Sequence, residues 1–134
     1  MRIVVVDDDA LACEMIVGAL QRQGHAVEVM KSALGLVNRV AGRDADGRPR
    51  PDLVILDHHL PGLSGLQSLQ LLAKDPVASQ VPVILHSGTY LGTSEEARAW
   101  HPRCAIVEKA ASFQPLMDRI RSMASSSSAE ARGA

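Results

Sequence analysis

A short aliphatic run that ends in an acid and then in turn residues most constrains how this chain can fold. The run is residues 53–56 (LVIL), followed by Asp57 and the segment HHLPGLSG. An unbroken aliphatic run of this length, closed by Pro and Gly, predicts a strand buried on both faces. A carboxylate at the carboxyl end of such a strand lies where open α/β sheets bind ligands. Asp57 is therefore either the centre of a site or only the cap of the following turn.

Four other stretches predict strands, and helical stripes separate them. The strand-like runs are residues 3–6, 26–30, 81–85 and 104–107, whereas apolar side chains recur at helical spacing in residues 10–23, 34–41, 65–74, 93–100 and 112–124. Short links between alternating strands and helices require a parallel sheet with helices on both faces. We therefore expect an α/β fold: a doubly wound, flavodoxin-like, five-stranded parallel sheet in the order 2-1-3-4-5 with five helices.

The length of 134 residues fits a single domain. Residues 1–124 carry all the periodic patterns, and the low-complexity residues 125–134 (SSSSAEARGA) predict a disordered Ser/Ala/Gly-rich tail. Residues 42–51 are polar and rich in Gly and Pro, which predicts an exposed loop. We expect His25 and His101 at surface turns, and His58 and His86 in loops that line the ligand edge.

Charge and hydropathy exclude several classes of protein. The net charge of −1, with acids and bases interspersed, gives no electrostatic case for nucleic acid or an anionic membrane. No apolar segment approaches membrane-spanning length, and the amino terminus does not resemble a signal peptide. Cys13 and Cys104 stand far apart and fit no metal-binding spacing. We therefore expect a cytoplasmic protein with reduced thiols.

Polar side chains directly follow four of the predicted strands. Asp7 and Asp8 follow the first strand, Asp57 the third, Ser87 the fourth and Lys109 the fifth. In the expected strand order, the first and third strands are neighbours, so their acids face each other. Clustered carboxylates repel one another, and Mg²⁺, which prefers oxygen ligands and binds phosphate, relieves that repulsion. A cation, a hydroxyl, an ammonium and a carboxylate nucleophile together can stabilise a transferring phosphoryl group.

The sequence resembles the receiver domain of bacterial two-component response regulators. The segments VVVDDD, LVILDHHLPGLSG, VILHSG and VEK match the motifs of that family in order and spacing, within residues 2–124. The resemblance implies a single-domain receiver that accepts a phosphoryl group on Asp57 from a histidine kinase or a phosphotransfer protein. It implies a Mg²⁺ site made by Asp7, Asp8, Asp57 and the main-chain carbonyl of His59. It also implies that Ser87 and Lys109 bind the phosphoryl oxygens.

The resemblance further implies how such a receiver works. It would not be an enzyme: we expect Mg²⁺-dependent self-phosphorylation at Asp57 and slow self-dephosphorylation, without turnover of a small molecule. No DNA-binding or catalytic pattern follows residue 124. We therefore expect output by contact with an unknown effector protein at the face of the fourth helix, fifth strand and fifth helix, with no nucleic acid or membrane partner. The tail also resembles a linker, so the chain can equally be part of a larger regulator.

Three positions depart from the family pattern. The resemblance implies that Ser87 and Ile106 are the switch positions. Ile106 stands where the family usually has Tyr or Phe, so it cannot signal through a hydroxyl. Ala110 replaces the Pro that usually follows Lys109, so we expect a trans bond and a different loop there. His59 replaces a common polar residue, which does not affect a carbonyl ligand.

Other functions remain open from the sequence. A pseudo-receiver adaptor would bind its partner independently of phosphorylation, and only Ile106 and Ala110 favour it. A small phosphatase or phosphotransferase of the haloacid dehalogenase class would turn over a phosphate ester, but only the DDD run at residues 7–9 resembles its first motif. The DHH triplet at residues 57–59 also occurs in a family of metal-dependent phosphoesterases, whose other acidic motifs this chain lacks.

Overall fold

The protein, seen in a computed structural model that describes residues 1–43 and 47–133, is built around one parallel sheet. Its strands are β1 (Arg2–Val6), β2 (Ala26–Met30), β3 (Leu53–Asp57), β4 (Val83–Ser87) and β5 (Cys104–Glu108). They lie in the order β2-β1-β3-β4-β5, and every neighbouring pair is parallel. The predicted doubly wound, flavodoxin-like α/β fold is confirmed.

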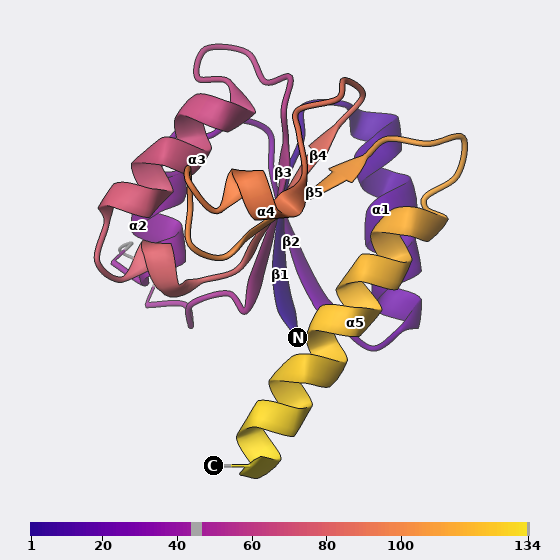
Figure 1. Cartoon of the computed structure of the whole chain (residues 1–134). Helices are drawn as coiled ribbons and strands as arrows, with labels where there is room; N and C mark the ends of the chain where they lie inside the picture. The colour runs from indigo at the N-terminus through magenta and orange to yellow at the C-terminus, as the bar shows by residue number, and fades with distance from the viewer. Residues whose placement is uncertain (44–46, 134) are drawn as a thin grey trace.

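Helices cover both faces of the sheet (Figure 1). They are α1 (Ala10–Arg22), α2 (Leu36–Ala41), α3 (Gly65–Lys74), α4 (Ser94–Ala97) and α5 (Gln114–Gly133), with a short 3₁₀ turn, η1 (Ala78–Gln80), after α3. In Figure 1, α1 and α5 lie to the right of the sheet, and α2 and α3 lie to its left. Among the described residues, no helix combines the length and the apolar character that a membrane span requires.

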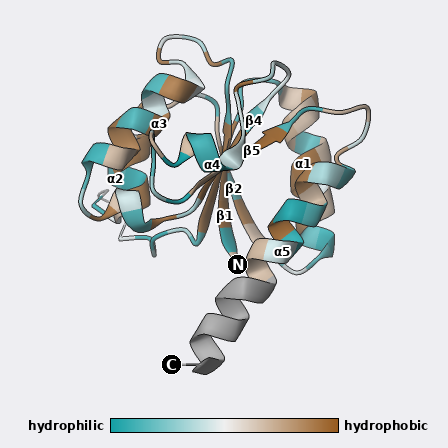
Figure 2. Ribbon diagram, in the orientation of Figure 1, coloured by the Kyte–Doolittle hydropathy of each residue, from teal (hydrophilic) through white to brown (hydrophobic). Residues whose placement is uncertain are grey.

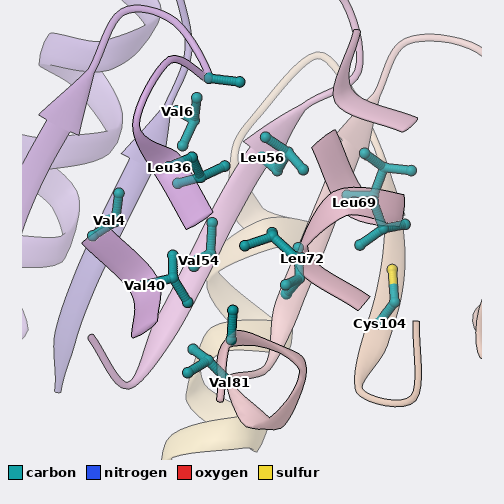
Figure 3. Close-up of a cluster of buried hydrophobic side chains, with 14 of the residues drawn as sticks. Val4, Val6, Leu36, Val40, Val54, Leu56, Leu69, Leu72, Val81 and Cys104 are labelled. Atoms are coloured by element: carbon teal, nitrogen blue, oxygen red, sulfur yellow. The ribbon is translucent and has the colours of Figure 1, made fainter. Parts of the chain in front are cut away.

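Two hydrophobic cores lie on opposite faces of the sheet because successive strand side chains alternate in direction. In β1, Val4 and Val6 belong to the core against α2 and α3, whereas Ile3 and Val5 belong to the core against α1 and α5. Figure 3 shows the first core, in which Val4, Val6, Val54 and Leu56 meet Leu36, Val40, Leu69 and Leu72. In Figure 2 the hydrophobic colours gather on the strands and the inner sides of the helices. The near-pure aliphatic runs are thus strands with two buried faces.

Local capping explains where the helices begin. The Asp9 carboxylate accepts hydrogen bonds from the N–H groups of Leu11 and Ala12 (3.0 and 3.1 Å), so Asp9 is the N-cap of α1. Ser64 forms a capping box with Gln67 at the start of α3, which is why this helix begins at Gly65. Helix α4 is shorter than predicted: it ends at Ala97, and residues 98–100 continue as turns.

The carboxyl-terminal helix extends further than the sequence predicts. The backbone of α5 is helical to Gly133, across the segment for which we expect a disordered tail, and residue 134 lies outside the described residues. Residues 125–131 contain neither Gly nor Pro, so nothing in them stops a helix that the packed residues before them have already nucleated. The domain boundary at residue 124 stays a prediction. The predicted loop at 42–51 is outside the helices and strands wherever it is described, and residues 44–46 lie outside the described residues.

His101 is a buried residue, so its prediction at a surface turn is wrong. Its side chain is 1% exposed, and Nδ1 accepts the N–H of Arg103 at 3.0 Å, which turns the ring inward. Nε2 is buried and has no hydrogen-bond partner among the described residues. Burial lowers the pKa of His101 to about 4, so the ring is neutral at neutral pH.

Acid should destabilise the protein partly through His101. Its pKa is lower in the folded chain than in the unfolded chain, where it is about 6.5, so the unfolded state binds more protons as pH falls between these values. The stabilisation is present above the unfolded pKa and is lost as pH falls toward about 4. As pH falls over this range, the unfolding free energy should drop in both proteins. We expect the drop to be smaller in His101→Met than in the wild type, by up to about 3 kcal/mol. Urea unfolding at a series of pH values measures the difference, and parallel curves would contradict it.

Gly65 should tolerate no side chain. A Cβ there would overlap the carbonyl oxygen of Asp57 and lie 2.7 Å from Cα of His58, so the start of α3 would have to move away from β3. We expect Gly65→Ala to cost about 1–3 kcal/mol of unfolding free energy. Gly18→Ala within α1 is the control: its Cβ meets only the end of Arg22, at 3.4 Å, so a neutral or stabilising effect is expected. Equal losses in urea unfolding of both variants would contradict this account.

Candidate functional site

Three carboxylates converge at the carboxyl edge of the sheet. Asp57 ends β3, and Asp7 and Asp8 follow β1, whose last residue Val6 pairs with Leu56 of β3. One carboxylate oxygen of each acid lies within 4.8 Å of those of the other two. Asp7 and Asp57 are only 3% and 4% exposed, whereas Asp8 is exposed. The predicted convergence of these acids is therefore present in the structure.

The backbone around Asp7 fixes its carboxylate in the site. The N–H of Asp7 donates to the carbonyl of Met30 at the end of β2, and the Asp7 carboxylate accepts the N–H of Asp9 at 2.9 Å. Burial raises the pKa of Asp7, and the nearby carboxylates of Asp57 and Asp8 raise it further against the opposing effects of the Asp9 N–H and of Lys109. Burial is thus the main reason why the charged form of Asp7 is disfavoured, and the neighbouring acids add to it.

Lys109 supplies the cation that the cluster has in this structure. Its Nζ lies 2.9 Å from Oδ1 of Asp57, and its side chain is 37% exposed, against 5% for Asp57. The backbone N–H of Lys109 donates to the carbonyl of Ser87 at 2.6 Å, which ties the loop after β5 to the end of β4. The ion pair thus joins the last residue of β3 to the residue after β5, two groups that the sequence predicts at the same edge of the sheet.

Ser87 ends β4, and its hydroxyl is engaged by its neighbours. The residue is fully buried, and its Oγ lies 2.9 Å from the carbonyl oxygen of Thr89 and 3.0 Å from the Thr89 nitrogen. It also lies 3.4 Å from Nδ1 of His58. Ser87 follows His86, which is opposite Asp57 in the ladder between β3 and β4. Ser87 is therefore at the predicted edge, in hydrogen bonds that the sequence did not predict.

Three histidines lie at this edge, and they differ in burial and in whether they belong to a strand or a loop. His86 lies within β4 and is 4% exposed, so its prediction as a loop residue is wrong, because the strand continues to Ser87. Burial and the charge of Lys109 lower its pKa to about 4, against the opposing effect of Asp57. His58 is half-buried beside Ser87, and burial, followed by the neighbouring His59, lowers its pKa. His59 is exposed, with its N–H 3.4 Å from Oδ1 of Asp57, and the role of its carbonyl stays a prediction.

Ile106 lies in β5, away from the charged cluster. It pairs with Leu85 of β4 and packs, partly buried, against the core on the α2 and α3 face. Its backbone N–H donates to Oγ of Ser94 at 2.9 Å, which links α4 to β5. The sequence gives no signal for this link because Ser94 precedes Ile106 by 12 residues. All peptide bonds in the described chain are trans, including the one after Lys109.

The oxygen donors of the cluster suit a hard divalent cation. The cluster contains two buried carboxylates and an exposed one, and among the described residues the ion pair to it comes from Lys109, at Asp57. An all-oxygen donor set that is open to solvent on the side of Asp8 is the kind that Mg²⁺ binds while keeping water ligands. Among the described residues, no imidazole or thiol joins these carboxylates in a metal-binding group. The residues present therefore fit a magnesium site.

Comparisons with known proteins agree with this arrangement. A family model described as response regulator receiver domain matches residues 3–121. The chain is 34% identical over 84 residues to the phosphate regulon transcriptional regulatory protein PhoB of Klebsiella pneumoniae, covering 63% of this chain and 34% of PhoB. It is 33% identical over 84 residues to protein PilH of Pseudomonas aeruginosa, covering 63% of this chain and 64% of PilH. The matched part therefore spans about a third of PhoB and less than two thirds of PilH.

Solved structures have the same fold. The receiver domain of the sensor histidine kinase PA1611 from Pseudomonas aeruginosa, with a magnesium ion coordinated in its active-site cleft, is 21% identical with a TM-score of 0.67, covering 89% of this chain and 92% of that one. The response regulator TrrA from Thermotoga maritima, in complex with Mg²⁺-BeF, is 23% identical with a TM-score of 0.68, covering 91% and 97%. The family match covers most of the chain. The three acids, the Ser87 hydroxyl and Lys109 of this chain lie at the carboxyl edge of the sheet, where the family motifs place them. The chain therefore belongs to the response regulator receiver domain family.

Proposed function

We propose that this chain is a phosphorylation-controlled signalling module that accepts a phosphoryl group on Asp57. The observation that carries the proposal is the buried Asp57 carboxylate, which has the Lys109 ammonium 2.9 Å away and the Asp7 and Asp8 carboxylates within 4.8 Å. We infer that the donor is the phosphohistidine of a histidine kinase or of a phosphotransfer protein, since these are the donors for the receiver family.

The reaction is an in-line transfer. A carboxylate oxygen of Asp57 forms a bond to phosphorus as the bond between phosphorus and the donor imidazole nitrogen breaks, and the imidazole keeps the electron pair and takes up a proton. The product is an acyl phosphate on Asp57. The Lys109 ammonium and the Ser87 hydroxyl are the groups of this chain that can bind the phosphoryl oxygens as charge develops on them.

Asp7, Asp8 and Asp57, with the main-chain carbonyl of His59, are the ligands that we propose for Mg²⁺. When bound, Mg²⁺ neutralises charge on the carboxylates and on the phosphoryl oxygens. The proposal is supported by the raised pKa of Asp7, which burial and the adjoining acids cause. It is also supported by the magnesium that the PA1611 receiver domain and TrrA bind.

We infer that output passes through the face of α4, β5 and α5 to a protein partner. Ser87 at the end of β4 pairs with Glu108 of β5, and the N–H of Lys109 donates a hydrogen bond to the Ser87 carbonyl. We therefore propose that a movement at the site displaces β5. Ile106 lies two residues from Glu108 and is tied to α4 through Ser94. An aliphatic side chain there can repack without exchanging a hydrogen bond.

Phosphorylation should be stoichiometric and specific. On incubation with Mg²⁺ and acetyl phosphate, we expect the intact mass to rise by one phosphoryl group, because Asp57 is the buried carboxylate that, among the described residues, is paired with a lysine. Intact-protein mass spectrometry measures the adduct, which should be absent in Asp57→Asn and after chelation of Mg²⁺.

The same experiment distinguishes the alternatives. Labelling that persists unchanged in Asp57→Asn would place the acceptor elsewhere, and continuous release of phosphate far beyond one equivalent would indicate a phosphatase. Absence of labelling, together with equal partner affinity for the wild type and Asp57→Ala, would indicate a pseudo-receiver.

Lys109→Ala should retain the fold and lose most of the phosphorylation response. The Lys109 side chain is more than a third exposed, so its removal disturbs the core little, but a charge-assisted contact to the phosphoryl group is lost. We expect labelling to slow by about 10- to 100-fold, from the usual worth of such a contact. Lys74→Ala, which removes an exposed lysine at the end of α3, is the matched control. Circular dichroism checks the fold, and an unfolded Lys109→Ala variant would show that the lysine is structural.

A further inference from the structure

The hydroxyl of Ser87 has three polar neighbours, which is as many hydrogen bonds as a hydroxyl can make. The Thr89 nitrogen lies 3.0 Å from Oγ, the Thr89 carbonyl oxygen 2.9 Å, and Nδ1 of His58 3.4 Å. A hydroxyl has one proton to donate and two lone pairs that accept. The Thr89 N–H can only donate and the Thr89 carbonyl can only accept. The remaining lone pair of Oγ is therefore left for His58.

This count assigns the roles of the imidazole. If the Ser87 proton goes to the Thr89 carbonyl, the nearer acceptor, Nδ1 of His58 must carry a proton and donate it to Oγ. A neutral His58 is then the tautomer with its proton on Nδ1, and its Nε2 is an acceptor. In the opposite assignment, the hydroxyl donates its proton to Nδ1 of His58. The Thr89 carbonyl oxygen would then lie 2.9 Å from an oxygen that donates no hydrogen bond to it, so the first assignment is favoured.

We propose that His58 is a positioning residue for the phosphoryl-binding hydroxyl of Ser87. With two donors fixed on its lone pairs, the Ser87 oxygen keeps its place, and only its proton is free to move. The proton has two destinations: the Thr89 carbonyl in the unphosphorylated chain and a phosphoryl oxygen on Asp57 in the phosphorylated chain. Donation by His58 into the same oxygen also strengthens the hydroxyl as a donor. This inference rests on the proposed function for its role in phosphorylation, and not for the hydrogen bond itself.

The backbone around His58 is fixed on both sides, so its ring is well placed for this task. The N–H of His58 donates to the carbonyl of His86 at 3.0 Å, and its carbonyl accepts the N–H of Gly65 at 2.9 Å. The first bond ties His58 to β4, next to Ser87, and the second ties it to the start of α3. The ring also contacts the ring of His59, with centroids 4.6 Å apart.

The first test is the tautomer of His58 in the unphosphorylated full chain without added metal. Long-range ¹H–¹⁵N spectra in mildly alkaline buffer distinguish a protonated from an unprotonated Nδ1. We expect a protonated Nδ1 in the wild type and a mixture of tautomers in Ser87→Ala, where the acceptor is gone. An unprotonated Nδ1 in the wild type, or a spectrum that Ser87→Ala leaves unchanged, would overturn the proposal.

The second test is a double-mutant cycle on the rate of labelling by acetyl phosphate and Mg²⁺. We expect His58→Leu to slow labelling by about 2- to 10-fold, the worth of one neutral hydrogen bond, and His58→Asn, whose amide can donate from a similar place, to restore most of the rate. In the Ser87→Ala background, His58→Leu should have no further effect. His25→Leu, which makes the same change at the opposite edge of the sheet, controls for loss of an imidazole.

The outcomes separate this inference from the proposed function. Equal slowing by His58→Leu with and without the Ser87 hydroxyl would overturn the positioning role while leaving phosphorylation of Asp57 intact. A wild-type chain that takes no label would instead contradict the proposed function and, with it, the role of His58 in phosphorylation. In that case the tautomer measurement still decides whether the hydrogen bond between His58 and Ser87 exists.

Discussion

The burial of two like-charged carboxylates at one edge of the sheet is the constraint on which the rest of this structure depends. Asp7 and Asp57 are each almost fully buried, and burial, together with the nearby charge of Asp57, raises the free-energy cost of ionising Asp7. Lys109 offsets part of that cost from the fifth strand, and the exposed Asp8 leaves the cluster open to a further cation. A chain that was selected for stability alone would not place these acids together, so the arrangement marks this edge of the sheet as a candidate functional site.

The scaffold holds these groups by short backbone bonds between neighbouring strand ends. The N–H of Lys109 donates to the Ser87 carbonyl and that of His58 to the His86 carbonyl, so the loops after β3 and β5 are both tied to the end of β4. Two aliphatic cores fix the strands themselves. Against this rigid frame, the groups with freedom to change partner are small: the Ser87 proton, and the Ile106 side chain at the margin of its core. Strand β5 connects the end of β4 to α4, through the pairing of Ser87 with Glu108 and the hydrogen bond between Ile106 and Ser94.

The sequence predicted the strands, their order and the residues of the acidic cluster because each has a local or topological signal. Aliphatic runs mark strands with two buried faces, and a polar residue directly after such a run must lie at the carboxyl edge. It did not predict that His101 and His86 are buried, since a lone histidine has no pattern that separates a turn from a core. It also missed the η1 turn, where the Asp75 carboxylate accepts the N–H groups of Val77 and Ala78.

The sequence by itself determined which chemical groups reach the site, because strand alternation and right-handed crossovers leave few topologies for such a pattern. Only the tertiary structure decided how those groups are bonded: that Lys109 pairs with Asp57, that Ser94 holds Ile106, and that His58 contacts Ser87. Whether two residues far apart in the sequence form a hydrogen bond depends on the direction of their side chains and on differences of a few tenths of an ångström in the donor–acceptor distance. Those quantities arise from the packing of the whole sheet and its helices, and no local stretch of residues encodes them.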